Sequence, residues 1–222
     1  KGPREFYEGE TARRIAADMA ARGGIINYED LRGFNAALVE PLKVEYRKYS
    51  VLTMPPSSSG GLSIAVMLNV LDQYPAALGM EGSAASRHLL IEAMRRGFDA
   101  RARVFKEGDS IVPEIITREY SRKAAAGLTT SPGAPAPNES PDTTHFTIAD
   151  AEGNLVTNTY TLSGFFGSQV TAARTGVLLN NHMSVFTNAP GTNNSIRPGK
   201  RYASTMAPTL VLRPDGSPWL AL

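Results

Sequence analysis

Two adjacent threonines, Thr143 and Thr144, stand where a proline-rich run meets a stretch of alternating apolar and polar residues. A threonine hydroxyl is a weak nucleophile at neutral pH and needs a base to take its proton. One such base is the threonine's own α-amine, which is free only when the threonine is the first residue of a chain. Thr143 is therefore a candidate nucleophile that a cut after Asp142 would release. Ordinary strand propensity of threonine is the alternative interpretation.

The run before Thr143, residues 129–142, contains four prolines and almost no apolar side chains. Such a segment cannot bury enough surface to fold, so we expect it to be mobile or extended. Its mobility would let a new chain end move away after a cut. The run also separates a helical first half from a β-rich second half, and we divide the chain into residues 1–142 and 143–222.

Apolar spacing and end signals predict the elements that position these residues. Helices are expected over 8–24, 27–34, 61–73 and 83–105, the second of them with Asn27 as its N-cap. Strands are expected as a pair within 42–54 and over 143–150, 155–162, 176–180 and 208–213. Gly60 and Gly61 precede the third helix without the lysine and spacing of a phosphate-binding loop, so they indicate a tight turn.

The strands over 143–150 and 155–162 are predicted to form a hairpin around the sequence AEGN. If Asp150 pairs with Leu155, Thr143 lies opposite Leu162, and its cross-strand neighbours include Thr161 and Ser163. A one-residue bulge would bring one of these two hydroxyls onto the face of Thr143. The same pattern also suits a threonine-rich strand pair without chemistry, and His145, in phase with Thr143, is interpreted as structural.

The composition excludes several classes of function. The chain has 222 residues, 42% of them hydrophobic, and a net charge of only +2 without a Lys/Arg block, so we expect no nucleic-acid partner. It has no cysteine, which removes disulfides, thiolate nucleophiles and zinc–thiolate sites. No apolar run approaches the roughly 20 residues of a membrane span. Neither a metal nor an organic cofactor is expected.

Long motifs in both halves of the chain resemble the gamma-glutamyltranspeptidase family. The motifs of the second half are TTHFTIADAEGNLVTNTYTL, FGS, GVLLNNHM, PGKRYASTMAPTLVL and PWLAL, and those of the first half are KGPREFYEGETARRIA, GGIINYEDLRGF and MPPSSSGGLSIAVMLNVL. The resemblance implies the α+β class, with part of the αββα sandwich of N-terminal-nucleophile (Ntn) hydrolases. It also implies a precursor that cleaves itself before a threonine and works as a heterodimer of large and small subunits on small-molecule γ-glutamyl or other acyl amides.

The resemblance assigns roles to residues of this chain. It makes Asp142 and Thr143 the cleavage site, Thr143 the nucleophile, and Thr161 the second catalytic threonine, which hydrogen-bonds the nucleophile. It implies substrate binding by four side chains: Ser163, His182, Ser204 and Thr205.

Several of these positions depart from the family pattern. Ser163 replaces a typical asparagine, His182 stands where glutamine or glutamate is usual, and Thr205 replaces the second of two serines that contact the substrate carboxylate. His182 is either a substrate contact or a packed core histidine. Val185 stands where the family has an aspartate that binds the ammonium of a γ-glutamyl group, and valine cannot pair with that charge.

Three functions therefore stay open at this point: a γ-glutamyl amidohydrolase and acyltransferase, a glutaryl-type acylase with the same mechanism, and a non-catalytic member or fragment. Both ends of the chain look cut, and the family's oxyanion glycine pair and carboxylate-binding arginine are expected after Leu222 and before Lys1. Without those parts the chain alone is expected to be inactive. The family works outside the cytoplasm, so a periplasmic or secreted location is expected.

Overall fold

A computed structural model describes residues 2–74, 82–126 and 142–222. The proline-rich run over 129–141, expected to be mobile or extended, lies outside the described residues. The chain divides into two compact units. The first comprises Lys1–Val39, Ser140–Thr143 and Thr161–His182, and the second comprises Glu40–Glu139, Thr144–Tyr160 and Met183–Leu222. These units are spatial, and they do not bear on the predicted division of the chain at Asp142/Thr143.

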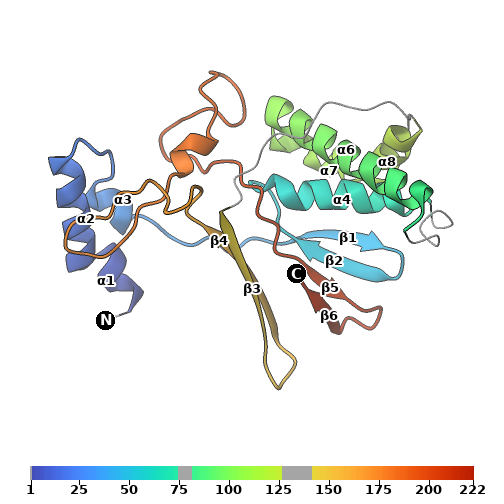
Figure 1. The fold of residues 1–222 in the computed structure, drawn as a ribbon, viewed down its shortest axis with the longest axis horizontal. Helices are drawn as coiled ribbons and strands as arrows, with labels where there is room; N and C mark the ends of the chain where they lie inside the picture. Colours follow the sequence, from blue (N-terminus) through green and yellow to red (C-terminus); the bar gives the residue numbers. More distant parts are fainter. Residues whose placement is uncertain (1, 75–81, 127–141) are drawn as a thin grey trace. The chain divides into compact units, whose positions relative to one another are not determined.

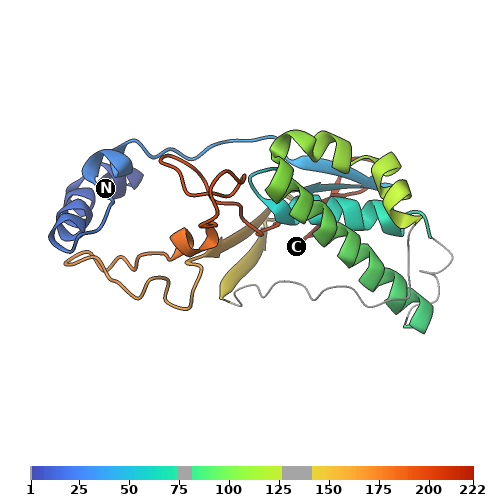
Figure 2. The ribbon, with the colours of Figure 1, turned by 90° about the horizontal axis from the view of Figure 1, so that it is seen from above.

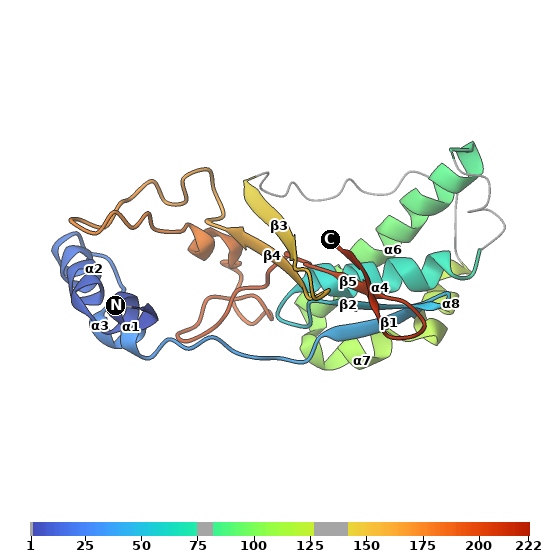
Figure 3. The same ribbon diagram turned by 90° about the horizontal axis from the view of Figure 1, so that it is seen from below.

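The first unit contains three short helices, which Figure 3 shows side by side: α1 (Pro3–Tyr7), α2 (Glu10–Ala21) and α3 (Tyr28–Arg32). Ile15 and Met19 of α2 pack with Ala172 in a small buried cluster. The predicted N-cap of α3 is confirmed: Asn27 accepts a hydrogen bond from the Asp30 N–H, and the Asp30 carboxylate accepts one from the Asn27 N–H. This reciprocal pair satisfies two N–H groups that the helix start leaves without partners.

A four-stranded antiparallel sheet forms the base of the second unit. Its strands are β1 (Leu42–Tyr46), β2 (Tyr49–Thr53), β5 (Leu210–Leu212) and β6 (Pro218–Ala221), in the order β1-β2-β5-β6. Val44, Val51 and Val211 lie across from one another on three neighbouring strands and are buried together. The sheet therefore joins the strand pair predicted within 42–54, which is confirmed, to strands from after Thr143.

Helix α4 (Ser59–Leu71) lies between that sheet and the long helix α6 (Ala84–Glu107), as Figures 1 and 2 show. Its sequence SGGLSIAVMLNVL is apolar on every side, which is typical of a helix that is covered all round. Ala65 faces the valines of the sheet, whereas Leu62, Val66 and Val70 pack against α6. The helix beginning near residue 83 is also confirmed, with Ser83 as its N-cap.

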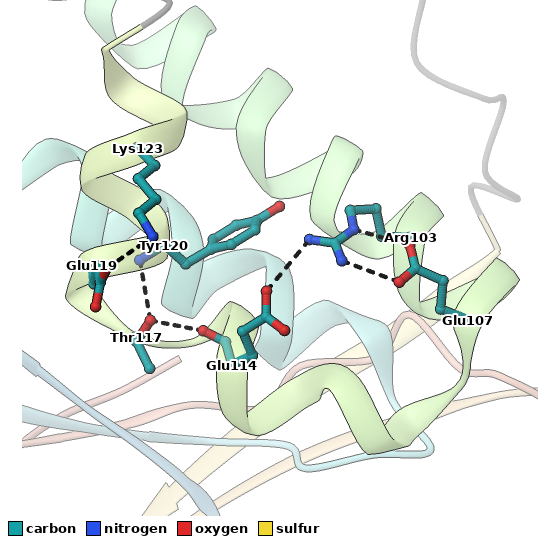
Figure 4. A network of polar contacts seen from close by, with 7 residues as sticks. All are labelled: Arg103, Glu107, Glu114, Thr117, Glu119, Tyr120 and Lys123. Atoms are coloured by element: carbon teal, nitrogen blue, oxygen red, sulfur yellow. Dashed lines mark hydrogen bonds and ion pairs between the residues drawn. The ribbon is translucent and has the colours of Figure 1, made fainter.

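Polar contacts tie the end of α6 to the short helices after it, η1 (Asp109–Ile111), α7 (Val112–Ile115) and α8 (Arg118–Ala125). Figure 4 shows Arg103 of α6 between Glu107, to which it donates two hydrogen bonds, and Glu114 at 3.9 Å. Thr117 caps α8 by accepting from the Tyr120 N–H at 3.1 Å. The Arg103 guanidinium lowers the pKa of the Glu107 carboxyl. These contacts are exposed and serve the fold.

The second sheet is a hairpin of two strands, β3 (Thr143–Ala149) and β4 (Leu155–Thr161). The strand expected over 176–180 does not form, and Leu178 makes only an isolated bridge with Thr171. Left-handed backbone at Arg174 and Gly176, with φ of 60° and 73°, lies in the turn between Thr171 and Leu178. Helices and antiparallel sheets together make the described part of the chain a mixed α and β structure.

None of the helices within residues 2–74, 82–126 and 142–222 has both the length and the apolar character needed to cross a membrane.

Candidate functional site

The hairpin turn sets the register of β3 against β4 and so determines which residue lies opposite Thr143. The Asp150 N–H donates to the Asn154 carbonyl at 3.1 Å, and the Asp150 carboxylate accepts from the backbone and side-chain amides of Asn154. Gly153, with φ of 85°, supplies the left-handed residue of the turn. This pairing is one residue tighter than the predicted pairing of Asp150 with Leu155, because the Asp150 side chain closes the turn onto Asn154.

The tighter turn changes which residue faces Thr143. His145 contacts Thr159 across the strands at 2.7 Å, which follows the register that the turn sets. Continued by two residues, this register places Thr161 opposite Thr143, where both strands end. The expected opposition of Thr143 and Leu162 is therefore wrong, and no bulge is required to bring the Thr161 hydroxyl to the face of Thr143.

The Thr161 side chain is hydrogen-bonded to the peptide group that precedes Thr143. Its hydroxyl donates to the Asp142 carbonyl at 3.0 Å, and its oxygen accepts from the Ser163 N–H at 2.9 Å. A hydroxyl has one hydrogen, and the N–H of Ser163 fixes the direction in which it points. The Asp142 carbonyl is thus polarised by a positioned donor. The expected bond between the hydroxyls of Thr161 and Thr143 stays a prediction.

The residues after Thr161 form a constrained loop. Ser163 has φ of 76°, and a left-handed conformation of a residue other than glycine costs about 1–3 kcal/mol. Asparagine tolerates this conformation better than serine does, so the family's usual residue suits the backbone found here. The Leu162 carbonyl accepts from the Asn181 N–H at 2.8 Å, which ties the loop to the chain leading to His182.

His182 and Val185 lie at the two ends of the short helix η2 (His182–Val185). His182 is half-buried, and burial lowers the pKa of its imidazole, which is therefore neutral at pH 7. The Val185 side chain is also half-buried, and its carbonyl accepts from the Asn194 side chain at 2.8 Å. A neutral imidazole and a valine offer an incoming ammonium group no opposite charge.

Ser204 belongs to the second unit, where the start of α4 holds its backbone. Its carbonyl accepts from the Ser59 N–H at 2.8 Å and from the Ser59 hydroxyl at 2.9 Å, and its N–H donates to the Ser57 carbonyl at 3.1 Å. The Ser58 hydroxyl donates to the Met206 carbonyl at 2.6 Å. Three successive serines therefore fix the segment that carries Ser204.

The close packing at the start of α4 requires glycine at positions 60 and 61. A Cβ on Gly60 would collide with the carbonyl of Thr205, and one on Gly61 would collide with the carbonyl of Met54. The two glycines let the chain segments approach closely at the start of α4. The sequence indicated a tight turn here, but it did not reveal that the serines of this turn hold Ser204. Three serines before two glycines were the signal that could have suggested it.

The described residues, 2–74, 82–126 and 142–222, contain no group of three or more His, Cys, Asp or Glu side chains that could hold a metal ion. The Asp142 carbonyl accepts from the hydroxyl of Thr161, which in turn accepts from the backbone amide of Ser163. Such groups suit acyl transfer, in which donors stabilise the negative charge that develops on a carbonyl oxygen.

A family model described as gamma-glutamyltranspeptidase matches residues 1–222. The chain belongs to the gamma-glutamyltranspeptidase family. This confirms the resemblance seen in the motifs on both sides of Thr143.

Relatives of this gamma-glutamyltranspeptidase family member include proteins named as hydrolases and as acylases. The glutathione hydrolase proenzyme of Escherichia coli (strain K12) is 36% identical over 241 residues, which cover 99% of this chain and 41% of that protein. The acylase ACY 1 proenzyme of Pseudomonas sp. (strain V22) is 39% identical over 222 residues, covering 96% of this chain and 40% of that protein.

A cephalosporin acylase from Bacillus halodurans has a similar crystal structure, with a TM-score of 0.85 at 28% identity over 97% of this chain and 40% of that one. The chain thus spans about two fifths of the length of these relatives.

Proposed function

We propose that the protein is a self-processing amidohydrolase and acyltransferase with an N-terminal threonine. Its precursor is cut between Asp142 and Thr143, and the freed Thr143 then cleaves γ-glutamyl amides such as glutathione, passing the acyl group to water or an amino acceptor. Membership of the gamma-glutamyltranspeptidase family and the relative named glutathione hydrolase proenzyme support this proposal.

The observation that carries the proposal is the hydrogen bond from Thr161 to the Asp142 carbonyl. In the self-cleavage step the Thr143 hydroxyl oxygen attacks that carbonyl carbon, and the oxygen that Thr161 already contacts becomes an oxyanion. The C–N bond then breaks, the Thr143 nitrogen gains a proton, and an ester joins Asp142 to Thr143. Water hydrolyses the ester and leaves a carboxylate on Asp142 and a free α-amine on Thr143.

In turnover, the same hydroxyl attacks the amide carbonyl of the substrate, and the free α-amine takes its proton. The amine of the substrate leaves, and water or an amino acceptor resolves the acyl-enzyme. Ser163, His182, Ser204 and Thr205 bind the substrate in this scheme. The close support of Ser204 by the serines before α4 is consistent with a residue whose position matters.

A second candidate keeps the mechanism and changes the acyl group to a glutaryl-type one without an ammonium. Two observations favour it: the half-buried Val185 lacks a charge, and the relative from Pseudomonas sp. (strain V22) is named an acylase. Burying an ammonium without a partner costs several kcal/mol, whereas an acyl chain without that charge avoids the cost.

The wider organisation is also a proposal. Residues 1–142 form the end of a large subunit and residues 143–222 the start of a small one, and both contribute to an αββα sandwich. Pairing of β2 with β5 supports a heterodimer that persists after the cut. The full-length protein acts without a metal or organic cofactor, in the periplasm or after secretion.

Cleavage is tested by intact mass and N-terminal sequencing of the purified full-length protein. We expect two polypeptides that meet at Asp142/Thr143, while Thr143→Ala leaves one polypeptide and lowers turnover by at least about 10³-fold. Thr144→Ala is the matched control and retains both activities, because its hydroxyl follows the cut. Cleavage and turnover in Thr143→Ala would show that the nucleophile is another residue.

The acyl group is tested by comparing rates on a γ-glutamyl anilide and on its glutaryl analogue, which lacks only the ammonium. Faster turnover of the γ-glutamyl compound supports the first candidate. Equal or faster turnover of the glutaryl compound would replace it by the second.

A further inference from the structure

His145 links three threonine side chains on one face of the hairpin. Its Nδ1 lies 2.7 Å from the Thr159 hydroxyl, and its Nε2 lies 3.0 Å from the Thr157 hydroxyl and 3.5 Å from that of Thr147. Thr147 shares β3 with His145, and the other two threonines belong to β4. All of these residues lie in the second unit.

The two threonine hydroxyls near Nε2 donate their hydrogens to backbone carbonyls. Thr157 donates to the carbonyl of Leu222 at 2.7 Å, and Thr147 donates to the carbonyl of Ala221 at 3.3 Å. Since a hydroxyl has only one hydrogen, both oxygens can only accept from His145. Nε2 must therefore carry a hydrogen, and in the neutral ring Nδ1 accepts from the Thr159 hydroxyl.

The result is a chain of hydrogen bonds with one direction, from Thr159 through His145 and Thr157 to Leu222. Its last acceptor is already fixed, because Thr209 and Leu222 exchange two backbone hydrogen bonds of 2.7 and 2.8 Å beside β5 and β6. The chain thus ends on the four-stranded sheet. The hydroxyls of Thr147 and Thr157 join the hairpin to main-chain carbonyls beside the sheet, and one imidazole contacts both hydroxyls.

Within the described residues, apolar burial gives the hairpin little support. Phe146, Ile148 and Val156 point to its opposite face and are 42%, 56% and 53% exposed. Their burial therefore contributes little to its position in this structure. Hydrogen bonds from Thr147 and Thr157 remain, and His145 orients both of these hydroxyls.

We propose that His145, as the tautomer with a hydrogen on Nε2, is a positioning residue that holds β3 against the end of β6 and so fixes the strand whose first residue is Thr143. His145 lies two residues after Thr143 and on the same face of the strand. The inference rests on the proposed role of Thr143, but its hydrogen-bond geometry can be tested separately.

The test replaces His145 in the full-length protein by glutamine and, separately, by asparagine. In His145→Gln the amide nitrogen reaches the place of Nε2 and still donates to Thr157, whereas in His145→Asn it is too short to do so. Loss of one oriented hydrogen bond is worth about 1 kcal/mol, so we expect self-cleavage and kcat to fall about fivefold in His145→Asn. We expect KM to stay unchanged, and His145→Gln to stay within about twofold of the unchanged protein.

Thr157→Val closes a double-mutant cycle. Because His145 acts through Thr157, the variant with both His145→Asn and Thr157→Val should be no slower than either single variant. Additive losses would overturn the proposal, as would a His145→Gln protein that is as slow as His145→Asn. A general loss of folding is recognised by a lower unfolding midpoint, because partial unfolding lowers the apparent kcat and leaves KM unchanged.

Nitrogen-15 NMR of histidine-labelled protein tests the tautomer without any activity. We expect the hydrogen of the neutral ring on Nε2 and a coupling of that nitrogen to the Thr157 hydroxyl. A ring that carries its hydrogen on Nδ1 would refute the inference even if Thr143 proves to be the nucleophile. Conversely, an active Thr143→Ala protein would refute the proposed function and leave the tautomer result standing.

Discussion

The two sheets in the described part of the chain are stabilised by different forces. The sheet β1-β2-β5-β6 buries Val44, Val51 and Val211 against α4, so apolar burial holds it. In the hairpin β3–β4 every residue of β3 is exposed, and its contacts to β6 are hydrogen bonds from threonines. Thr143, the candidate nucleophile, is the first residue of this hydrogen-bonded hairpin.

This difference suggests a division of work between stability and chemistry. Apolar burial is strong but has no direction, whereas hydrogen bonds contribute less and specify orientation. A reacting hydroxyl needs orientation within a fraction of an ångström, which polar contacts such as those of Thr161 provide. We therefore expect substitutions in the hairpin to change rates, and substitutions in the other sheet to change stability.

The largest effect is expected at Thr161 in the full-length protein. Thr161→Val keeps the shape of the side chain and removes the donor to the Asp142 carbonyl, so self-cleavage should slow by about 10²–10³-fold. Thr161→Ser keeps the hydroxyl and should remain within about tenfold of the unchanged protein. The rate is measured by the appearance of the two polypeptides on a gel, and equal rates for both variants would show that the hydroxyl is not the donor.

The same substitution in each sheet tests the comparison directly. Val51 is 5% exposed and Val156 is 53% exposed. Val51→Ala should lower the free energy of unfolding by about 2 kcal/mol, because it leaves a cavity beside α4. Val156→Ala should change it by less than about 0.5 kcal/mol. Urea unfolding of the two variants measures both values, and similar losses would mean that the hairpin has a core of its own.

A smaller effect is expected where α4 holds Ser204. Gly60→Ala places a Cβ against the Thr205 carbonyl, and such overpacking costs about 1–3 kcal/mol. Part of that cost should appear as a higher KM, since the segment with Ser204 and Thr205 must move. Gly153→Ala is a useful contrast, because it meets no neighbouring atom and strains only the hairpin turn. A KM unchanged by Gly60→Ala would argue against substrate binding by this segment.

The smallest effect concerns the turn of the hairpin. The side-chain amide of Asn154, and then its backbone N–H, lower the pKa of the Asp150 carboxyl. A carboxyl whose pKa is lower in the folded state stabilises the turn above its unfolded pKa of about 3.9, and this contribution is lost as the pH falls through the folded pKa. The protection of the Asn154 amide from exchange, measured as its intrinsic rate divided by its observed rate, should therefore fall in acid. Asp150→Asn should remove that pH dependence, and an unchanged profile would contradict the assignment.

Much of the fold follows from local signals in the sequence. Asn27 and Ser83 begin helices as their side chains predict, and the strand pair within 42–54 turns at Arg47, where φ is 55°. Two predictions, the hairpin register and the strand at 176–180, were wrong because both depend on the backbone of a turn. The hairpin register depends on how the Asp150 carboxylate closes the turn. The strand expected at 176–180 is reduced to an isolated bridge, Thr171 with Leu178, after a turn that contains left-handed residues. Neither backbone detail can be read from apolar periodicity.

The sequence identified residues of the candidate site but not the contacts that these residues make. The motifs singled out Thr143 and Thr161, yet no spacing rule says that the Thr161 hydroxyl points at the Asp142 carbonyl. Likewise, the support of Ser204 by Ser58 and Ser59 joins residues about 145 positions apart. Contacts of that separation depend on the tertiary fold, which the order of the motifs along the chain does not specify.

The sheet order β1-β2-β5-β6 gives the proposed cut an unusual thermodynamic consequence. β2 and β5 pair through Ser50 and Leu212, Val51 and Val211, and Leu52 and Leu210, and the peptide bond before Thr143 lies between these strands in the chain. Before the cut, unfolding is a unimolecular event. After it, unfolding also separates two polypeptides, so the midpoint rises with protein concentration by mass action. Maturation would thus make the stability of the same sheet depend on dilution without breaking a single bond within it.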